Sequence, residues 1–346
     1  MEDSVPSLRE WRALYRAAVE FKEIECWRWM YDSDLFGVQD PVSGEIGYCC
    51  IMGNLGELFA LAVYLGSEGL EGYLKIQAGE ILPGDTMEAL TVQKCLMASF
   101  EDRGDLKKRD LQVIKELGLK FRGRNAWPLF RSYRPGYHPW YLTAREAVYL
   151  TLALEQAKEV ALRFREDPEL LTPAKENHCL VRVPERAGRG WRWRDEWLEP
   201  APPEREEPVV EPPDEALLDE IRKRALVHRG TWEMDLFYFP GAVKEGERPY
   251  YPQMLLWVNH HSGFILGFDM AKPGEYGLGF AQRFAELVED LRFLPQEVWV
   301  RREETFALLE PLAEGLGIEL KWVERLPALE EAQDSLFEFD RFGPAL

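Results

Sequence analysis

The first thirty residues place apolar side chains at the three- and four-residue spacing of one helical face. These apolar positions are Trp11, Leu14, Ala18 and Phe21. They follow Ser7 and Glu10, a hydroxyl and a carboxylate three residues apart. This pair is a capping box, which satisfies the free backbone N–H groups at the start of a helix. We therefore predict a helix that begins after Ser7 and ends near Met30.

The rest of the N-terminal half alternates between strand and helix patterns. A second capping box, Thr143 with Glu146, starts a long amphipathic helix that ends before Pro168. The apolar run 58–65 suits a buried strand but also fits a helix, because so short a run has no clear period. The other expected elements are strands at 36–39, 46–52 and 91–100, helices at 67–77 and 106–117, an irregular stretch at 119–142, and a hairpin at 179–183 and 191–197. This mixture predicts an α+β domain.

The C-terminal half has a more regular pattern. Asp214 starts a helix, and shorter apolar segments separated by turn residues follow. The expected strands are 231–239, 254–258, 264–268, 297–300 and 319–323, and the expected helices are 280–291, 309–316 and 329–337. After the first helix the order is βββαβαβα, which predicts a second α+β domain with a mixed sheet.

A segment rich in proline and glutamate separates these two halves. Residues 199–213 read EPAPPEREEPVVEPP, so backbone donors are scarce and charge is dense. Such a composition favours an extended polyproline-type linker. A chain of 346 residues also has the usual length of two domains. We predict an N-terminal domain at 1–198, a linker at 199–213 and a C-terminal domain at 214–346.

Charge is distributed unevenly between the halves. The whole chain has a net charge of -19. Residues 1–198 contain 27 Lys or Arg and 31 Asp or Glu, a net of -4, whereas residues 214–346 contain 14 and 25, a net of -11. Strong negative charge disfavours non-specific contact with nucleic acid and anionic membranes. We therefore expect any anionic partner to bind the N-terminal half.

The cysteines and the N-terminus indicate a reducing compartment. The five cysteines include no CxxC pair, so we expect reduced and mostly buried thiols. The sequence begins with acidic residues and lacks the apolar segment of a secretory leader. Its longest apolar run, 58–65, is too short to span a bilayer. These features predict a cytoplasmic protein without membrane contact.

Basic and aromatic residues gather in one stretch of the N-terminal half. No acidic residue lies between Leu117 and Arg145, and a second basic segment covers 182–194. Arginine suits phosphate and carboxylate groups, and aromatic rings suit planar ones. The candidate binding residues are Arg122, Arg124, Arg131, Arg134, Tyr137 and Trp140. The alternative, favoured by the many carboxylates elsewhere, is that the rings fill the core and the arginines form internal ion pairs.

The C-terminal half resembles the ribonuclease-H-like fold, specifically the integrase core. Residues 251–267 are similar to the antiparallel hairpin of that core, and residues 295–300 to the parallel strand that follows its first helix. The resemblance therefore implies a fold of this kind for about residues 231–337. The whole chain also resembles a bacterial two-domain family of unknown function, which implies no chemistry.

The resemblance implies where a two-metal site would lie. Its carboxylates come from the first strand, the end of the fourth strand and a helix, where they bind two Mg²⁺ ions. Asp235 matches the first position, and Glu331 or Asp334 could match the third. The middle position falls on Arg301 or Arg302, and arginine repels Mg²⁺. This departure predicts an inactive domain without a metal ion.

Neither half contains a local motif typical of an enzyme, such as GxSxG or HExxH. We therefore expect a non-catalytic binding or scaffold protein that needs no cofactor. Its partner would be an anionic ligand, a nucleic acid or a protein, bound at 117–145 and 182–194. The alternative is a metal-dependent nuclease or other phosphoryl-transfer enzyme that uses Asp235 with Glu331 or Asp334.

Overall fold

A computed structural model describes residues 4–81, 86–188, 190–203, 214–224, 227–277 and 279–341. Its contacts divide the chain into two compact units, one of residues 1–135 and 139–204 and one of residues 136–138 and 205–346. Most of the predicted linker, 204–213, lies outside the described residues. In the part of the chain that is described, no helix combines the length and apolar character needed to cross a membrane.

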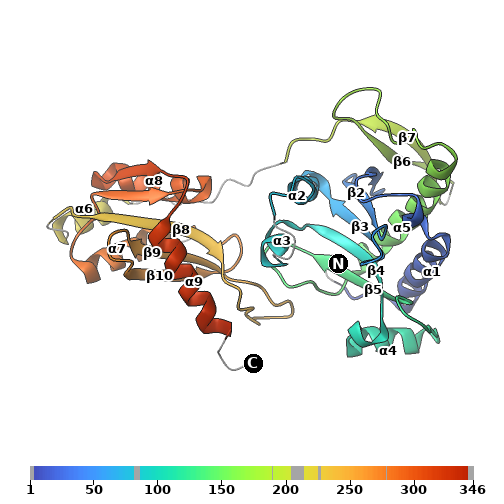
Figure 1. The fold of residues 1–346 in the computed structure, drawn as a ribbon, viewed down its shortest axis with the longest axis horizontal. Coiled ribbons are helices and arrows are strands. Elements are labelled where there is room, and N and C mark those ends of the chain that lie inside the picture. Colours follow the sequence, from blue (N-terminus) through green and yellow to red (C-terminus); the bar gives the residue numbers. More distant parts are fainter. Residues whose placement is uncertain are drawn as a thin grey trace. The chain divides into compact units, whose positions relative to one another are not determined.

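The N-terminal unit contains a seven-stranded sheet in the order β5-β4-β3-β2-β1-β6-β7 (Figure 1). Strands β1 and β6 pair in parallel, and the other neighbouring strands are antiparallel. The strands are β1 (Phe36–Gln39), β2 (Ile46–Met52), β3 (Ala60–Leu65), β4 (Cys95–Glu101), β5 (Trp127–Tyr133), β6 (Cys179–Ala187) and β7 (Gly190–Leu198). The helices are α1 (Leu8–Ile24), α2 (Gly66–Gln77), α3 (Thr86–Val92), α4 (Lys108–Glu116) and α5 (Ala144–Glu166), with 3-10 turns at Cys26–Arg28 and Arg103–Asp105.

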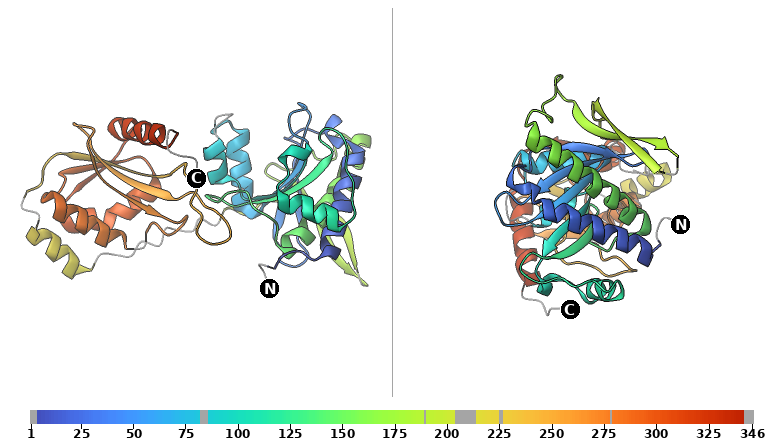
Figure 2. Two further views of the ribbon diagram at one scale, coloured as in Figure 1. Left: turned by 90° about the horizontal axis from the view of Figure 1, so that it is seen from below. Right: turned by 90° about the vertical axis from the view of Figure 1, so that its right-hand side faces the viewer.

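Helices α1 and α5 cover one face of this sheet and bury the main core (Figure 2). Fully buried Phe21 of α1 and Leu150 of α5 pack there with Leu61 and Phe100 of the strands. Helix α2 packs on the opposite face, where Tyr73 contacts Tyr64. Both predicted capping boxes are present, at Ser7 with Glu10 and at Thr143 with Glu146.

Two N-terminal elements differ from the prediction. Residues 127–133, expected to be irregular, form β5, the edge strand beside β4. The strand expected at 91–100 begins later, at Cys95, because residues 86–92 form α3. The run 58–65 forms a strand, β3, from Ala60, so the strand interpretation of this run is confirmed and the helix alternative is wrong.

The C-terminal unit contains a five-stranded mixed sheet in the order β10-β9-β8-β11-β12. Strands β8, β9 and β10 form an antiparallel meander, and β8, β11 and β12 run in parallel. The strands are β8 (Thr231–Tyr238), β9 (Gln253–Asn259), β10 (Ile265–Ala271), β11 (Glu297–Val300) and β12 (Glu319–Trp322). The helices are α6 (Glu215–Arg224), α7 (Phe280–Leu291), α8 (Glu303–Leu316) and α9 (Pro327–Arg341). The predicted order βββαβαβα is thus confirmed.

Helices lie on both faces of this sheet. Trp232 of β8 is fully buried against Phe284 of α7, in a core that also contains α6 and α8. Helix α9 covers the other face, where Leu329 and Ala332 pack on Leu256 of β9. The alternation of β8 therefore sends its even-numbered side chains to one core and its odd-numbered side chains towards α9.

Candidate functional site

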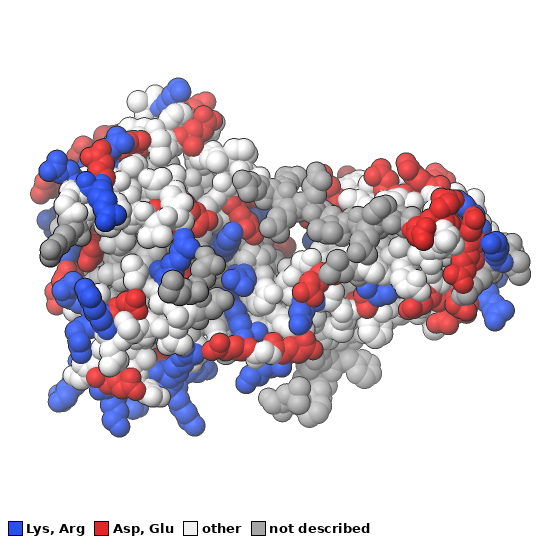
Figure 3. Space-filling view, turned by 180° about the vertical axis from the view of Figure 1, so that it is seen from behind, with Lys and Arg blue, Asp and Glu red and all other residues white. Residues whose placement is uncertain are grey.

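Exposed basic side chains gather on α4 and on the segments next to it. We call this surface the α4 patch. It consists of Arg103, Lys107, Lys108, Lys115, Lys120, Arg122 and Arg124, all of them exposed. Figure 3 shows blue side chains gathered at the lower end of the N-terminal unit, the end at which Figure 1 places α4. Within the described residues, none of the seven forms an ion pair.

Helix α4 is held in place by one buried carboxylate, Asp110. Its Oδ2 accepts the backbone N–H of Lys107 at 2.9 Å and so caps the start of the helix. Arg131 of β5 donates to both oxygens, at 2.9 Å to Oδ1 and 2.7 Å to Oδ2. The two side chains are only 13% and 9% exposed. This bidentate pair therefore joins α4 to the edge of the sheet.

Aromatic rings lie beneath this pair. The guanidinium carbons of Arg109 and Arg131 lie 4.3 and 4.7 Å from the ring centroid of Tyr141. Phe121 packs on the core, with its ring 6.1 Å from that of Tyr15. These arginine–aromatic contacts stabilise the base of the patch and leave its outer basic residues facing solvent.

The candidate binding residues of the sequence prediction take different positions. Arg122 and Arg124 are exposed in the segment between α4 and β5, within the α4 patch. Arg131 is only 13% exposed and binds Asp110, so it adds little to the accessible surface. Arg134 is exposed just after β5, and Trp140 is half-buried and pairs with the backbone of Ser132. Tyr137 belongs to the C-terminal unit, where its backbone pairs with Tyr250.

The second basic segment, 182–194, is mostly engaged in internal contacts. Arg182 is 4% exposed and donates to Gln156, Glu159 and Asp195. Arg194 pairs with Glu185 and Glu196, and Arg186 lies over the ring of Trp191. Arg192 is exposed. Arg189 lies outside the described residues. This segment therefore mainly attaches the β6–β7 hairpin to α5.

Asp235, the first carboxylate of the alternative metal site, pairs with two arginines. Asp235 is fully buried on β8. Its Oδ2 accepts from Nε of Arg301 at 2.8 Å, and Nε of Arg302 lies 3.1 Å from its Oδ1. Both arginines directly follow β11. Two guanidinium groups thus lie where the resemblance would require metal-binding carboxylates.

The predicted helix carboxylates are directed away from Asp235. Glu331 and Asp334 are both exposed on α9. The neighbouring Glu330 instead accepts from Arg301 at 3.0 Å and from Arg325 at 2.5 Å. The hydrogen bond from Arg325 lowers the pKa of Glu330. Among the described residues, no group of three histidine, cysteine or acidic side chains is arranged to hold a metal ion.

A second buried carboxylate, Glu233, was not identified from the sequence. Its Oε2 accepts the backbone N–H of Leu329 in the first turn of α9 at 2.8 Å. Its Oε1 shares a 2.5 Å hydrogen bond with Nδ1 of His260, which precedes β10. The sequence does contain a signal for this pair, because two carboxylates two residues apart on a strand, Glu233 and Asp235, lie on the same face. Both carboxylates thus serve the attachment of α9 to the sheet.

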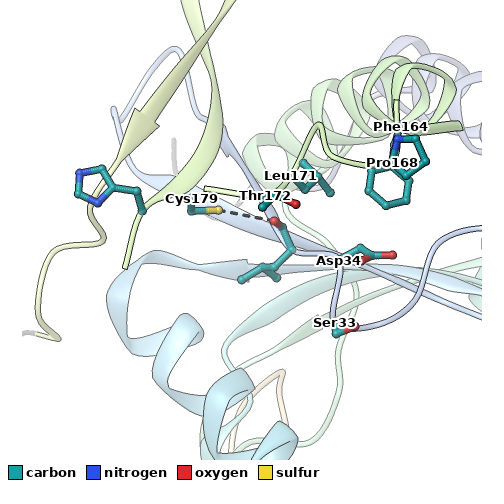
Figure 4. A pocket seen from close by; sticks show the side chains of 9 residues that line it. Ser33, Asp34, Phe164, Pro168, Leu171, Thr172 and Cys179 are labelled. Carbon is teal, nitrogen blue, oxygen red and sulfur yellow. Dashed lines mark hydrogen bonds between the residues drawn. The ribbon is translucent and has the colours of Figure 1, made fainter. Parts of the chain in front are cut away.

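A cavity of about 250 Å³ lies beside the start of β6 (Figure 4). Ser33, Asp34, Thr172 and Cys179 are among the residues that line it. The sulfur of Cys179 lies 3.7 Å from the carbonyl oxygen of Leu35, and burial raises the pKa of this thiol to about 12. Because the thiolate is the reactive form, this cysteine is not an activated nucleophile.

Comparisons with protein families agree with the division into two halves. Residues 11–182 match the model of a domain of unknown function, DUF7309. Residues 217–337 match that of a second domain of unknown function, DUF6930. No curated protein matches the chain. No homology with ribonuclease H is shown. The chain therefore contains two domains of unknown function, a DUF7309 domain in its N-terminal half and a DUF6930 domain in its C-terminal half.

Proposed function

We propose that this chain is a non-catalytic binding protein whose N-terminal unit contacts an anionic partner through the α4 patch. The observation that carries the proposal is the group of seven exposed basic side chains without an ion pair among the described residues. Residues 103–124 contain eight Lys or Arg and only three Asp or Glu, in a chain of net charge -19. One of those three acids, Asp110, is committed to Arg131.

The physical argument concerns electrostatic repulsion. Like charges so close together repel one another and lower the stability of the free protein. A polyanion relieves this repulsion and gains contacts to several cations at once, with release of its counterions. The pair of Asp110 and Arg131 holds α4 rigidly, so the patch keeps its geometry before a partner binds.

The test removes four charges from the patch: Lys108→Ala, Lys115→Ala, Arg122→Ala and Arg124→Ala together. Binding to single-stranded RNA, single-stranded DNA and heparin is measured at low and moderate salt. We expect the variant to bind much more weakly. For single strands, the slope of log affinity against log salt should flatten by about 3, because each lost phosphate contact contributes roughly 0.7. The thermal midpoint should change little, since these side chains are exposed.

A matched control removes the same charge elsewhere on this unit: Arg16→Ala, Arg28→Ala, Lys75→Ala and Arg194→Ala. Each of these side chains already pairs with a carboxylate. Binding should weaken only by the general effect of net charge. If the wild-type chain binds none of the three polyanions, or if both variants lose affinity equally, the α4 patch is not the binding surface.

The alternative function, a metal-dependent nuclease using Asp235 with Glu331 or Asp334, makes a separate prediction. Because Arg301 and Arg302 neutralise Asp235, we expect no Mg²⁺- or Mn²⁺-dependent cleavage of plasmid DNA or RNA. Cleavage by the wild-type chain that disappears in a folded Asp235→Asn variant would establish the enzyme instead. Cleavage that persists in this variant would come from a contaminant.

A further inference from the structure

The two sheets expose four edge strands, and three of them are protected against pairing with another chain. Proteins commonly protect such edges with charge, proline, short strands or covering segments. Strand β7 carries four charged residues among its nine. Strand β12 has only four residues, two of them charged. Strand β5 contains Pro128 and is bridged at Ser132 by the backbone of Trp140.

The fourth edge strand, β10, has fewer of these protections along residues 267–271. Among the described residues it has a sheet neighbour, β9, on one side only. Its sequence ILGFDMA contains a single charged residue, Asp269. Phe268 and Met270 are 64% and 41% exposed, although isolated large apolar side chains gain stability from burial. They lie on the α9 face, opposite Leu256 and Met254 of β9, which are buried.

We propose that two copies of this chain associate through antiparallel pairing of their β10 strands. A bulge between Ile265 and Gly267 leaves 267–271 as the regular part of the strand. A two-fold axis through Asp269 places Phe268 of each copy opposite Met270 of the other, on the same face of the joined sheets. Sulfur–aromatic contacts of this kind are favourable. On the other face Gly267 meets Ala271, and neither is bulky.

The charges also fit a second copy. The axis brings the two Asp269 residues together, and like charges directly opposite each other are destabilising. Each Asp269, however, already forms an ion pair with Arg283 of α7, with Nε 2.5 Å from Oδ2. Two such ion pairs across the axis form a group of two negative and two positive charges with no net charge. The strand is thus complementary to itself in side-chain size, face and charge.

The test measures the mass of the full chain by sedimentation over a wide range of concentration. We expect self-association of the wild type, and a monomer for Phe268→Lys and for Met270→Lys. The matched control is Phe264→Lys, which changes an equally exposed side chain outside residues 267–271. It should dimerise as the wild type does. Thermal melts confirm that each variant remains folded, because all three side chains are exposed.

Cysteine cross-linking tests the register. An Asp269→Cys variant should form a disulfide-linked dimer on mild oxidation, since this residue faces its own copy across the axis. A Phe264→Cys variant should not. The proposal is overturned if the wild type is monomeric at every concentration, which would also be the result if β10 served only an extended peptide of another protein. It is equally overturned if Phe264→Lys disrupts association as strongly as Phe268→Lys.

Discussion

Replacing Arg301 with alanine is expected to lower the free energy of unfolding of the C-terminal unit by about 3 kcal/mol. The change leaves the carboxylate of Asp235, which is fully buried, with Arg302 as its remaining cation. Removing one partner of a buried ion pair typically costs about 3–5 kcal/mol, because the other charge remains in a poorly solvated site. We expect the lower end of this range because Arg302 still contacts Asp235. Urea unfolding followed by tryptophan fluorescence measures the effect.

Two further variants separate the pair from its surroundings. Asp235→Leu combined with Arg301→Met removes both charges and should recover most of the lost stability, since apolar side chains tolerate this burial. Arg325→Ala removes an exposed partner of Glu330 and should change the free energy of unfolding little, because solvent screens exposed ion pairs. A loss below 1 kcal/mol for Arg301→Ala would mean that the ion pair contributes little to the attachment of α9.

Replacing Arg131 with alanine should destabilise the N-terminal unit by a similar amount, about 3–5 kcal/mol. The variant leaves the buried carboxylate of Asp110 with the backbone N–H of Lys107 as its donor, and it removes one of the two guanidinium groups over Tyr141. We expect a lower thermal midpoint and faster hydrogen exchange at the amides of α4, because this pair joins the helix to β5.

The control for this variant is Arg122→Ala, at an exposed arginine nine residues earlier. It should leave both the melt and the exchange of α4 unchanged, while contributing to the loss of polyanion binding. If Arg131→Ala melts like the wild type but weakens polyanion binding, then Arg131 acts on the partner directly and its pairing with Asp110 is dispensable.

Local patterns predicted much of the fold. The capping boxes at Ser7 and Thr143 fixed the starts of two long helices, and Gly118 takes the left-handed conformation, at φ 71°, that suits its position just after α4. Strand β5 was missed because its alternation of Pro128, Phe130 and Ser132 lies among glycines and aromatics typical of loops. Its pairing with β4 is a tertiary contact, which outweighs local preference.

The site depended on contacts that no local pattern contains. Arg122 and Arg131 belong to the same acid-free stretch, yet only Arg131 meets a carboxylate, and Asp110 lies before that stretch. The basic residues of α4 itself precede it too, so Lys108 and Lys115 were overlooked although the charge count over 103–124 would have found them. On α9, adjacent residues point in different directions, so Glu330 binds Arg301 whereas Glu331 does not. A sequence prediction that is uncertain by one residue cannot tell these two carboxylates apart.

The contacts of Glu233 affect when the C-terminal unit can fold during synthesis. The two oxygens of Glu233 bind the turn before β10 and the first turn of α9. The hydrogen bonds of this side chain are therefore complete only after residue 329 has been synthesised. Until then Oε2 of Glu233 lacks its donor, the backbone N–H of Leu329, and the apolar face of β9 remains uncovered. The N-terminal unit can complete its core much earlier on the ribosome. The C-terminal unit should therefore be the part of the nascent chain that needs protection by chaperones for longest.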